Sequence, residues 1–515
     1  MKKILLMLLG ALLSLPAMAQ QFSEEYNGQT LTYSVIDAMA KTCQLNAGDY
    51  NDGNPKAGNN FKGELVIPSE VKNGATTYTV VAIGDYGFYG CDELTSIIIP
   101  ETVKSLGQIT FYDCTALKTV QLPSGLTTIG KSVFCGCSSL ESVVIPDAVT
   151  TIGRDAFTGC EGLTKAEFAS IESLLKIKFE SDSNPLIYAH NLYINGEEVT
   201  DIVIPESFTE ILDYTFAGSA IKSIVIPSSV TSMGRYAFSE CVGLTKAEFA
   251  SIESLLKIKF KYDSNPLEYA HNLYINGEEV TDVVIPESFT EILDYTFVGS
   301  AIKSVVIPSS VTSIGMRAFD ECNELNSVSL PEELTTIEWG AFRNCTSLTS
   351  INFPESLTKI GGYAFSGCTG LTSLHIPAGI EEIGEDALGC RNVREVYYPA
   401  ENPVECDYNA FTYRKYILGA PDYNYYRDIV SEGTLYVPAE AVEKCKKIDP
   451  WKQFKNIQAY DFNSGIEDVV VDTDASAPCE IYNLSGVKVG SDLNGLTPGL
   501  YIFCQGNRTE KVMVK

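Results

Sequence analysis

The sequence contains few of the residues from which catalytic and metal sites are most often built. Only three histidines and two tryptophans occur among 515 residues. His190 and His271 occupy the same position in two near-identical segments, and His375 lies in a strand-like run. No H-E-x-x-H, G-x-S-x-G, Walker or Rossmann pattern is present. We therefore predict that the protein is not an enzyme and has no catalytic residues, no cofactor and no metal site.

Three motifs that could carry metal or acid chemistry have simpler interpretations. Cys135-Gly136-Cys137 has no histidine nearby, and the run from Asp49 to Asn54 places its glycine one position early for an EF-hand loop. The paired acids Glu197-Glu198 follow a turn signal. We interpret these motifs as a core cysteine with a neighbour, a polar loop, and solvated carboxylates.

Positive charge and long apolar runs are also scarce. Lysine and arginine number 37 against 66 acidic residues, which gives a net charge of −29. Such a surface repels phosphate backbones and anionic lipids, so nucleic acid is excluded as a partner. Beyond the N-terminus no run of about 18 apolar residues occurs, so no membrane-spanning segment is predicted.

Residues 1–19 have the pattern of a secretory signal peptide. Lys2 and Lys3 precede an apolar run from Ile4 to Leu15, and Ala17-Met18-Ala19 forms a small-residue cleavage site before Gln20. The protein is therefore predicted to be exported.

Most of the remaining chain repeats one apolar phrase every 22 or 23 residues. A unit reads L-x-S-V-x-I-P-x-x-V-T-x-I-G-x-x-A-F-x-x-C, as in residues 140–160. Alternation along its strand places Val143 and Ile145 inward and Val144 outward. A single coil cannot bury its apolar side chains, but stacked coils share a core. We predict a repeat solenoid of the leucine-rich-repeat kind, with one short strand in each coil.

Many of the fifteen cysteines follow the same period. Cys91, Cys114, Cys137 and Cys160 are spaced by 23 residues, and a fixed phase favours buried thiols stacked from coil to coil. Coils about 4.8 Å apart also fall within the range that a disulfide can bridge. The odd total leaves at least one thiol unpaired.

Residues 163–243 and 244–324 form a tandem duplication that differs at twelve positions. Each copy contains IESLLKIKF, which has helical spacing, and LYINGEEVTDIVIP, which reads as a hairpin. Asn195-Gly196 and Asn276-Gly277 are strong type I′ turn signals. We expect these inserts to protrude from the stack.

Over residues 63–398 the repeat resembles that of BspA-like leucine-rich repeat surface proteins. Residues 434–460 resemble the terminal unit of that family, with Trp451 and Phe454 as capping hydrophobic residues. The run IYNLSGVKV…LTPGLYIF…KVMVK resembles the C-terminal sorting domain of type IX secretion cargo. This second resemblance implies the outer-membrane surface or exterior of a Gram-negative bacterium; a small β-module that only caps the fold is the alternative.

The predicted organisation has six parts. They are a signal peptide (1–19), an N-terminal cap (20–62), the solenoid (63–400), a terminal repeat with C-terminal cap (401–460), a linker (461–478) and a small all-β domain (479–515).

The outward middle positions of the strands are the candidate contact surface. Seven of these thirteen positions, from Ile98 to Tyr397, are apolar, although outward residues are usually polar. The alternative is that β-branched residues merely favour strands. The predicted partner-binding face comprises Val203, Val225, Val284, Val306, His375 and Tyr397.

The resemblance to BspA-like proteins implies adhesion to extracellular proteins, such as host matrix or plasma glycoproteins, or to other cells. The alternative is a surface protein that captures glycans or serves as a scaffold, for which aromatic platforms would be needed. Candidate platform residues are Tyr188, Tyr193, Tyr269, Tyr274, Tyr397, Tyr398 and Tyr413.

Overall fold

The computed structural model describes residues 21–26, 28–46, 61–415, 424–426, 428–462, 479–483, 488–490, 499–505 and 508–514. They belong to two compact units, Met1–Val280 (unit 1) and Thr281–Lys515 (unit 2). The predicted signal peptide, the run from Asp49 to Asn54 and most of the linker lie outside the described residues.

Unit 1 begins with a sheet that covers the first coil. Its strands are β1 (Gln21–Tyr26), β2 (Gln29–Asp37), β3 (Thr42–Leu45), β5 (Glu70–Asn73) and β6 (Thr76–Ile83), in the order β1-β2-β3-β6-β5. Leu31, Tyr33 and Val80 of this sheet are fully buried. Strand β6 also pairs in parallel with β8 (Ser105–Leu106), which joins this cap to the solenoid.

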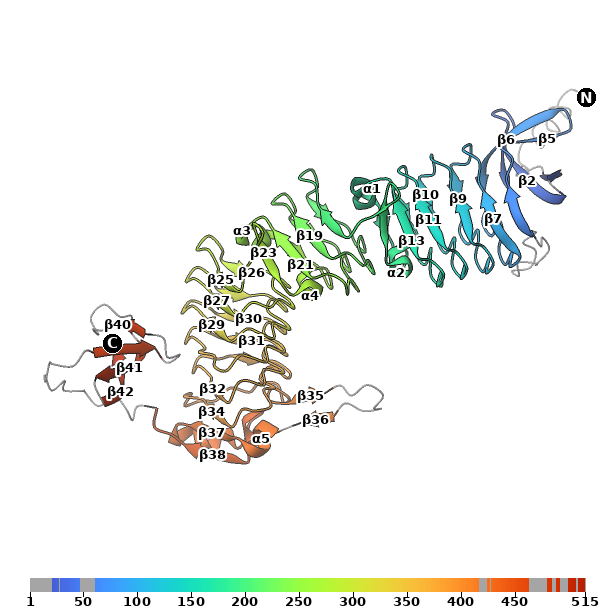
Figure 1. Ribbon diagram of the computed structural model, residues 1–515. Coiled ribbons are helices and arrows are strands. Elements are labelled where there is room, and N and C mark those ends of the chain that lie inside the picture. Colours follow the sequence, from blue (N-terminus) through green and yellow to red (C-terminus); the bar gives the residue numbers. More distant parts are fainter. Residues whose placement is uncertain are drawn as a thin grey trace, which may run out of the picture. The chain divides into compact units, whose positions relative to one another are not determined.

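The solenoid of unit 1 has a first row of parallel strands, one from each successive coil (Figure 1). The row comprises β4 (Gly63–Val66), β7 (Leu94–Ile98), β9 (Thr119–Gln121), β11 (Ser142–Ile145), β13 (Lys165–Phe168), β15 (Leu192–Ile194), β17 (Asp201–Val203), β19 (Ser223–Ile226), β21 (Lys246–Phe249) and β23 (Leu273–Ile275). Val143 is 1% exposed and Val144 is 53% exposed, so the predicted alternation is confirmed.

A second row of two-residue strands was not predicted. In unit 1 it comprises β10 (Thr128–Ile129), β12 (Thr151–Ile152), β14 (Lys178–Phe179), β18 (Glu210–Ile211), β20 (Ser232–Met233) and β22 (Lys259–Phe260). They pair in parallel within two sheets, β10-β12-β14 and β18-β20-β22, as Ile129 does with Ile152. Each coil with this V-T-x-I segment therefore has two strands, because the backbone extends for two residues before the following glycine.

The third side of each coil consists of turns that carry two stacked columns of side chains. The rings of Phe111, Phe134 and Phe157 stack with centroids 5.4 and 5.3 Å apart. The Cys137 thiol donates a hydrogen bond to the carbonyl of Phe111 in the preceding coil, 3.1 Å away. Cys114, Cys160 and Cys241 each donate the same bond to the phenylalanine of the coil before them. The cysteines of this column are buried free thiols, which confirms the prediction.

The glycine of the Ile-Gly pair is required by the close approach of coils rather than by a turn. A Cβ atom on Gly153 would lie 2.7 Å from the amide nitrogen of Lys131 in the preceding coil. No side chain fits at that separation, so this position keeps the coils in direct contact.

The duplicated inserts do not protrude, contrary to expectation. Helix α1 (Ile171–Lys176) begins at Ser170, which forms a capping box with Ser173, and buries Leu174 and Leu175. Strand β15 extends the first row by pairing with β13, and β14 extends the second row by pairing with β12. The second copy repeats this with α3 (Ile252–Lys257). Each insert is thus part of the stack, because its apolar side chains need the shared core.

Helix α2 (Leu186–Ala189), repeated as α4 (Leu267–Ala270), lies within each insert, between its second-row strand and its first-row strand. The buried Asn184 donates from Nδ2 to the carbonyls of Tyr214 and Thr215, at 2.8 and 2.9 Å. The predicted turn is confirmed, since Asn195 and Gly196 have φ values of 52° and 83° between β15 and β16 (Glu197–Glu198). Strand β17, expected within the hairpin, instead starts the next coil.

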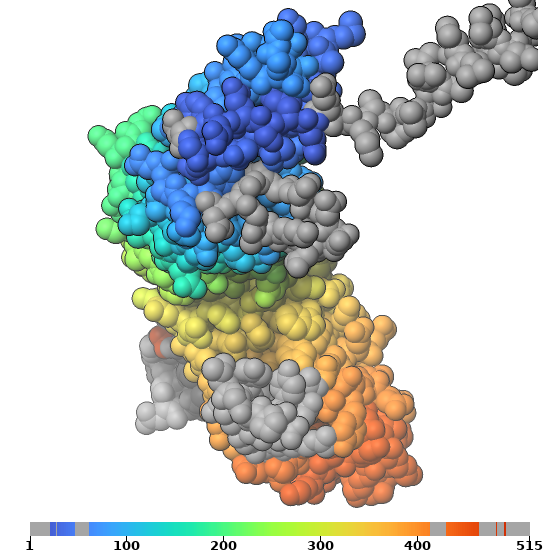
Figure 2. All heavy atoms as spheres, turned by 90° about the vertical axis from the view of Figure 1, so that its right-hand side faces the viewer, coloured from blue at the N-terminus to red at the C-terminus, as the bar shows by residue number. Residues whose placement is uncertain are grey.

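Unit 2 has two rows of strands of the same kind. The first row comprises β25 (Asp282–Val284), β27 (Ser304–Val306), β29 (Ser327–Ser329), β32 (Ser373–His375), β34 (Glu395–Tyr397), β37 (Thr434–Val437) and β38 (Asn456–Ala459). The second row comprises β26 (Glu291–Ile292), β28 (Ser313–Ile314), β30 (Thr336–Ile337), β31 (Lys359–Ile360) and β33 (Glu382–Ile383). The space-filling view shows the coils of this unit, in yellow and orange, packed against one another (Figure 2).

The last coils are closed by the predicted capping residues. Trp451 is fully buried, stacks on Tyr398 at 4.3 Å, and donates from Nε1 to the carbonyl of Val404. Phe454 is buried as well, so both predicted capping residues are confirmed.

Beyond the cap, four antiparallel strands form the predicted small all-β part. They are β39 (Cys479–Asn483), β40 (Lys488–Gly490), β41 (Gly499–Gln505) and β42 (Arg508–Val514), in the order β40-β39-β41-β42. Across the described part of the chain, no helix has the length and apolar character needed to span a bilayer.

Candidate functional site

The outward side chains of the first-row strands form the surface that we call the strand face. Outward residues such as Val144 and Val225 stand between two buried neighbours of the same strand, so the hydrophobic core fixes their position. Parallel pairing brings the equivalent residues of successive coils side by side. The result is a rigid surface on which like positions are arranged in columns.

In unit 1, Val203 and Val225 are direct neighbours on β17 and β19. Val203 is 65% exposed, whereas Val225 is half-buried. The same column continues with Glu248 and Tyr274. An aliphatic pair with one exposed member, Val203, therefore lies beside an acid and an aromatic ring.

A lysine links that acid and that ring. Lys246 Nζ lies 2.7 Å from Glu248 Oε2 and 4.8 Å from the centroid of Tyr274. The first copy repeats the arrangement, with Lys165 2.8 Å from Glu167 and 4.5 Å from the Tyr193 ring. At partly exposed positions such contacts contribute about 0–1 kcal/mol each, so they order the surface more than they stabilise the fold.

Unit 2 contains the other predicted valine pair. Val284 and Val306 are neighbours on β25 and β27, with exposed fractions of 66% and 48%. The next residue of the column is Ser329. The four predicted valines therefore form two pairs, one in each unit.

The predicted His375 and Tyr397 belong to a longer column of rings. His375 stacks on Tyr397 with centroids 4.5 Å apart, and Tyr397 stacks on Tyr436 at 4.7 Å. Tyr460 stands edge-on to Tyr397 and Tyr436, at 5.3 and 5.7 Å. We call His375, Tyr397, Tyr436 and Tyr460 the aromatic ladder.

Sequence reasoning missed Tyr436 and Tyr460. The signal for Tyr436 was present, because it precedes Pro438 by two residues, as Tyr397 precedes Pro399. Tyr460 carries no such signal, because its segment lacks the proline.

Burial and the nearby Glu395 carboxylate raise the pKa of Tyr397 to about 12. Its hydroxyl donates a hydrogen bond to Glu395 Oε2 at 3.3 Å. Tyr397 is therefore a neutral hydrogen-bonding group over the physiological pH range.

The other predicted platform tyrosines have different positions. Tyr398 is fully buried against Trp451, so its prediction as a surface platform is wrong. It follows Tyr397 directly, and alternation turns its side chain into the core. Tyr193 and Tyr274 lie on the strand face, whereas Tyr269 donates from its hydroxyl to Asp263 within the insert. Tyr188 is half-buried, and the side chain of Tyr413 lies outside the described part of the chain.

The remaining motifs have structural roles. His190 ends helix α2, and its Nδ1 lies 2.8 Å from the carbonyl oxygen of Gly218. Glu197 and Glu198 are exposed on the hairpin. Among the residues that the structure describes, no group of three or more His, Cys, Asp or Glu side chains could hold a metal ion.

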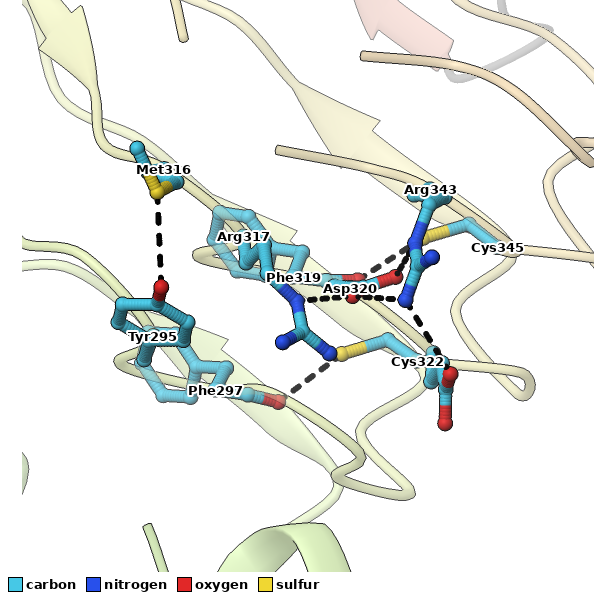
Figure 3. A network of polar contacts seen from close by, with 10 residues as sticks. Tyr295, Phe297, Met316, Arg317, Phe319, Asp320, Cys322, Arg343 and Cys345 are labelled. Atoms are coloured by element: carbon cyan, nitrogen blue, oxygen red, sulfur yellow. Dashed lines mark hydrogen bonds and ion pairs between the residues drawn. The ribbon is translucent and has the colours of Figure 1, made fainter. Parts of the chain in front are cut away.

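Unit 2 also contains a buried ionic network on its turn side (Figure 3). Asp320 is fully buried and accepts from Arg317 Nε at 2.5 Å and from Arg343 Nε and Nη2 at 2.9 and 2.8 Å. Arg343 also reaches Glu321, 3.4 Å away. In the first copy of the duplication, Tyr236 and Ser239 replace Arg317 and Asp320. The network thus links two successive coils of unit 2, and its hydrogen bonds and ion pairs involve neither valine pair.

These columns, two strand rows and turn-side ladders define a leucine-rich-repeat solenoid. The family model described as BspA type leucine rich repeat region matches residues 69–185, 189–297 and 290–417, in six copies. The chain therefore belongs to the BspA-type leucine-rich repeat family.

One solved structure, with a TM-score above 0.5, supports the fold assignment. A leucine-rich repeat protein from Bacteroides ovatus is 21% identical with a TM-score of 0.51, over 85% of this chain and 100% of its own. A leucine rich cell surface protein from Faecalibacterium prausnitzii is 24% identical with a TM-score of 0.43, over 73% and 94% of the two chains. The pneumococcal vaccine antigen PcpA is 18% identical with a TM-score of 0.43, over 85% and 99%. No curated protein sequence is a significant match. At 21% identity, the likeness to the Bacteroides ovatus protein shows the fold alone.

Proposed function

We propose that the protein is an exported, surface-displayed adhesin that binds extracellular proteins or glycoproteins through the strand face. The observation that carries this proposal is the exposure of Val203 and Val284, at 65% and 66%, on rigid parallel sheets. Membership of the BspA-type family supports a surface protein built for binding rather than catalysis.

An exposed aliphatic pair on a fixed backbone is suited to the centre of a protein interface. Burying apolar surface stabilises a complex by about 25 cal/mol per Å². Because the sheet holds these side chains in place already, less conformational entropy is lost on binding. Polar neighbours such as Glu248 provide the hydrated rim that such interfaces have.

The sequence of residues 1–19 and the C-terminal resemblance support export to the outside of a Gram-negative cell. In this proposal, the signal peptide directs passage across the inner membrane. The strands of residues 479–514 then serve as the sorting domain for the outer membrane.

The test is a binding assay of the full-length mature chain against immobilised matrix and plasma glycoproteins. Val203→Asp and Val284→Asp place a charge at each valine pair without touching the core. Val242→Asp is the matched control, because Val242 is 87% exposed but lies on the turn side of unit 1.

We expect saturable binding that weakens at least tenfold in one or both strand-face variants and is unchanged in Val242→Asp. Circular dichroism should show the same folded state in all three. Equal binding by every variant would place the contact surface elsewhere and refute the proposal.

A further inference from the structure

The strand face changes its chemistry within unit 2. Strands β25 and β27 expose Val284 and Val306, whereas the four coils from β32 to β38 present no aliphatic side chain at their outward strand positions. These eight positions are Ser373, His375, Glu395, Tyr397, Thr434, Tyr436, Asn456 and Gln458. We call them, together with Tyr460, the polar–aromatic surface.

Two columns run along this surface. Ser373, Glu395, Thr434 and Asn456 form the first column, and His375, Tyr397, Tyr436 and Gln458 form the second. Tyr460 lies beside Tyr397 and Tyr436 of the second column. Asn456 donates from Nδ2 to Thr434 Oγ1 at 2.7 Å, and Gln458 donates from Nε2 to Asn456 Oδ1 at 3.3 Å. The polar groups are therefore held in place in the absence of any ligand.

The rings of the aromatic ladder present two kinds of surface to a ligand. Within the stack of His375, Tyr397 and Tyr436, the ring faces cover one another, so their edges and polar tips point outward. Tyr460 stands at 74° and 67° to Tyr397 and Tyr436 and is 41% exposed. It is the ring of the ladder that is best placed to pack against the C–H face of a ligand.

The chemistry of these groups selects a ligand class. Hydroxyls and carboxamides both donate and accept hydrogen bonds, as the hydroxyls of a sugar do. The Glu395 carboxylate and the net charge of −29 oppose an anionic ligand. The lack of outward aliphatic side chains opposes a purely apolar one. We infer that the polar–aromatic surface is a binding site for a neutral glycan that lies across the coils from β32 to β38.

This site is separate from the proposed adhesive valine pairs. It uses different side chains and different ligand chemistry, so either proposal can fail without the other.

The experiment measures binding of the full-length mature chain to soluble dextran, mannan, laminarin and inulin by affinity electrophoresis and calorimetry. Heparin and polygalacturonate are the charged comparisons. The variants are Tyr460→Ala, Gln458→Ala and Tyr436→Phe. Tyr112→Ala is the matched control, because Tyr112 stacks on Tyr89 at 5.3 Å in another ring pair away from the strand face.

We expect at least one neutral polysaccharide to bind, with a tenfold or greater loss of affinity in Tyr460→Ala and in Gln458→Ala. Tyr436→Phe keeps the ring but removes one hydrogen-bonding group, so its loss should be about fivefold. Tyr112→Ala and Val203→Asp should bind as the parent does. If Tyr460→Ala does not fold, the exposed Gln458→Ala variant decides.

Three results would overturn the inference. They are no binding to any of the neutral polysaccharides, tighter binding to the charged ones, and unchanged affinity in folded Gln458→Ala together with Tyr436→Phe.

Discussion

The buried Asp320 network allows a sharp test of how charge is accommodated inside the coil. Asp320 is fully buried, and the side chain of Arg317 is only 10% exposed. Asp320→Ser removes the carboxylate that Arg317 Nε binds, in a position that water reaches poorly. Breaking one partner of a buried ion pair costs about 3–5 kcal/mol.

The duplication supplies the compensating change. Tyr236 and Ser239 occupy the equivalent positions in the first copy, where no ions are buried at these sites. Arg317→Tyr combined with Asp320→Ser should therefore bring stability back to within about 1 kcal/mol of the parent chain. Arg343 is 28% exposed and keeps Glu321 as a partner, so its charge stays solvated.

Hydrogen exchange followed by mass spectrometry is the suitable assay, because repeat proteins lose structure locally. In peptides covering residues 304–345, Asp320→Ser should lower protection about 100-fold or more, since each tenfold corresponds to about 1.4 kcal/mol. Peptides covering residues 223–264 are the internal control and should not change. The reasoning is refuted if Asp320→Ser leaves protection intact, or if the double variant is as unprotected as the single one.

Three further predictions concern the core. Burial, and then the Asp407 carboxylate, raise the pKa of Asp386 to about 7. The folded state is therefore more stable when this carboxyl group is protonated. That stability is fully present below about pH 4, the pKa in the unfolded chain, and is lost as the pH rises through 7. Asp386→Asn should raise the melting temperature at pH 8 and leave it unchanged at pH 4; an equal effect at both would contradict this. Burial raises the pKa of the Cys160 thiol to about 12. Iodoacetamide at pH 8 should modify Cys160 only after urea is added, and rapid labelling of the folded protein would disprove its inertness. Phe134→Ala removes one ring from the phenylalanine column and should cost about 3–5 kcal/mol in chemical unfolding, with a loss below 1 kcal/mol as the opposing result.

Much of the coil could be predicted from the sequence because its determinants are local or periodic. Side chains alternate along a strand whatever surrounds it, so the inward Val143 and outward Val144 follow from spacing alone. The Asn195-Gly196 turn depends on two residues with positive φ, which the dipeptide favours. The cysteine column follows from a constant phase, because equal spacing in a stack places equal residues side by side.

Features that depend on contacts between coils were not predictable in the same way. The inserts have helical spacing, but only the stack shows that Leu174 and Leu175 complete its core. The two-residue strands exist only through pairing with a neighbouring coil. The need for glycine at position 153 comes from the preceding coil, because a Cβ atom there would collide with the amide nitrogen of Lys131.

The strand face shows most clearly the difference between features that follow from the repeat and features that depend on contacts between coils. The sequence alone determined the solenoid, its period and the outward direction of Val203, Val284 and Tyr397, because these depend on the repeat and on strand geometry. Only the tertiary structure showed that Tyr398 is buried and that Tyr460 joins the aromatic ladder. The physical reason is that a side chain's exposure and partners depend on residues brought beside it by packing, and those residues lie a whole coil or more away in the chain.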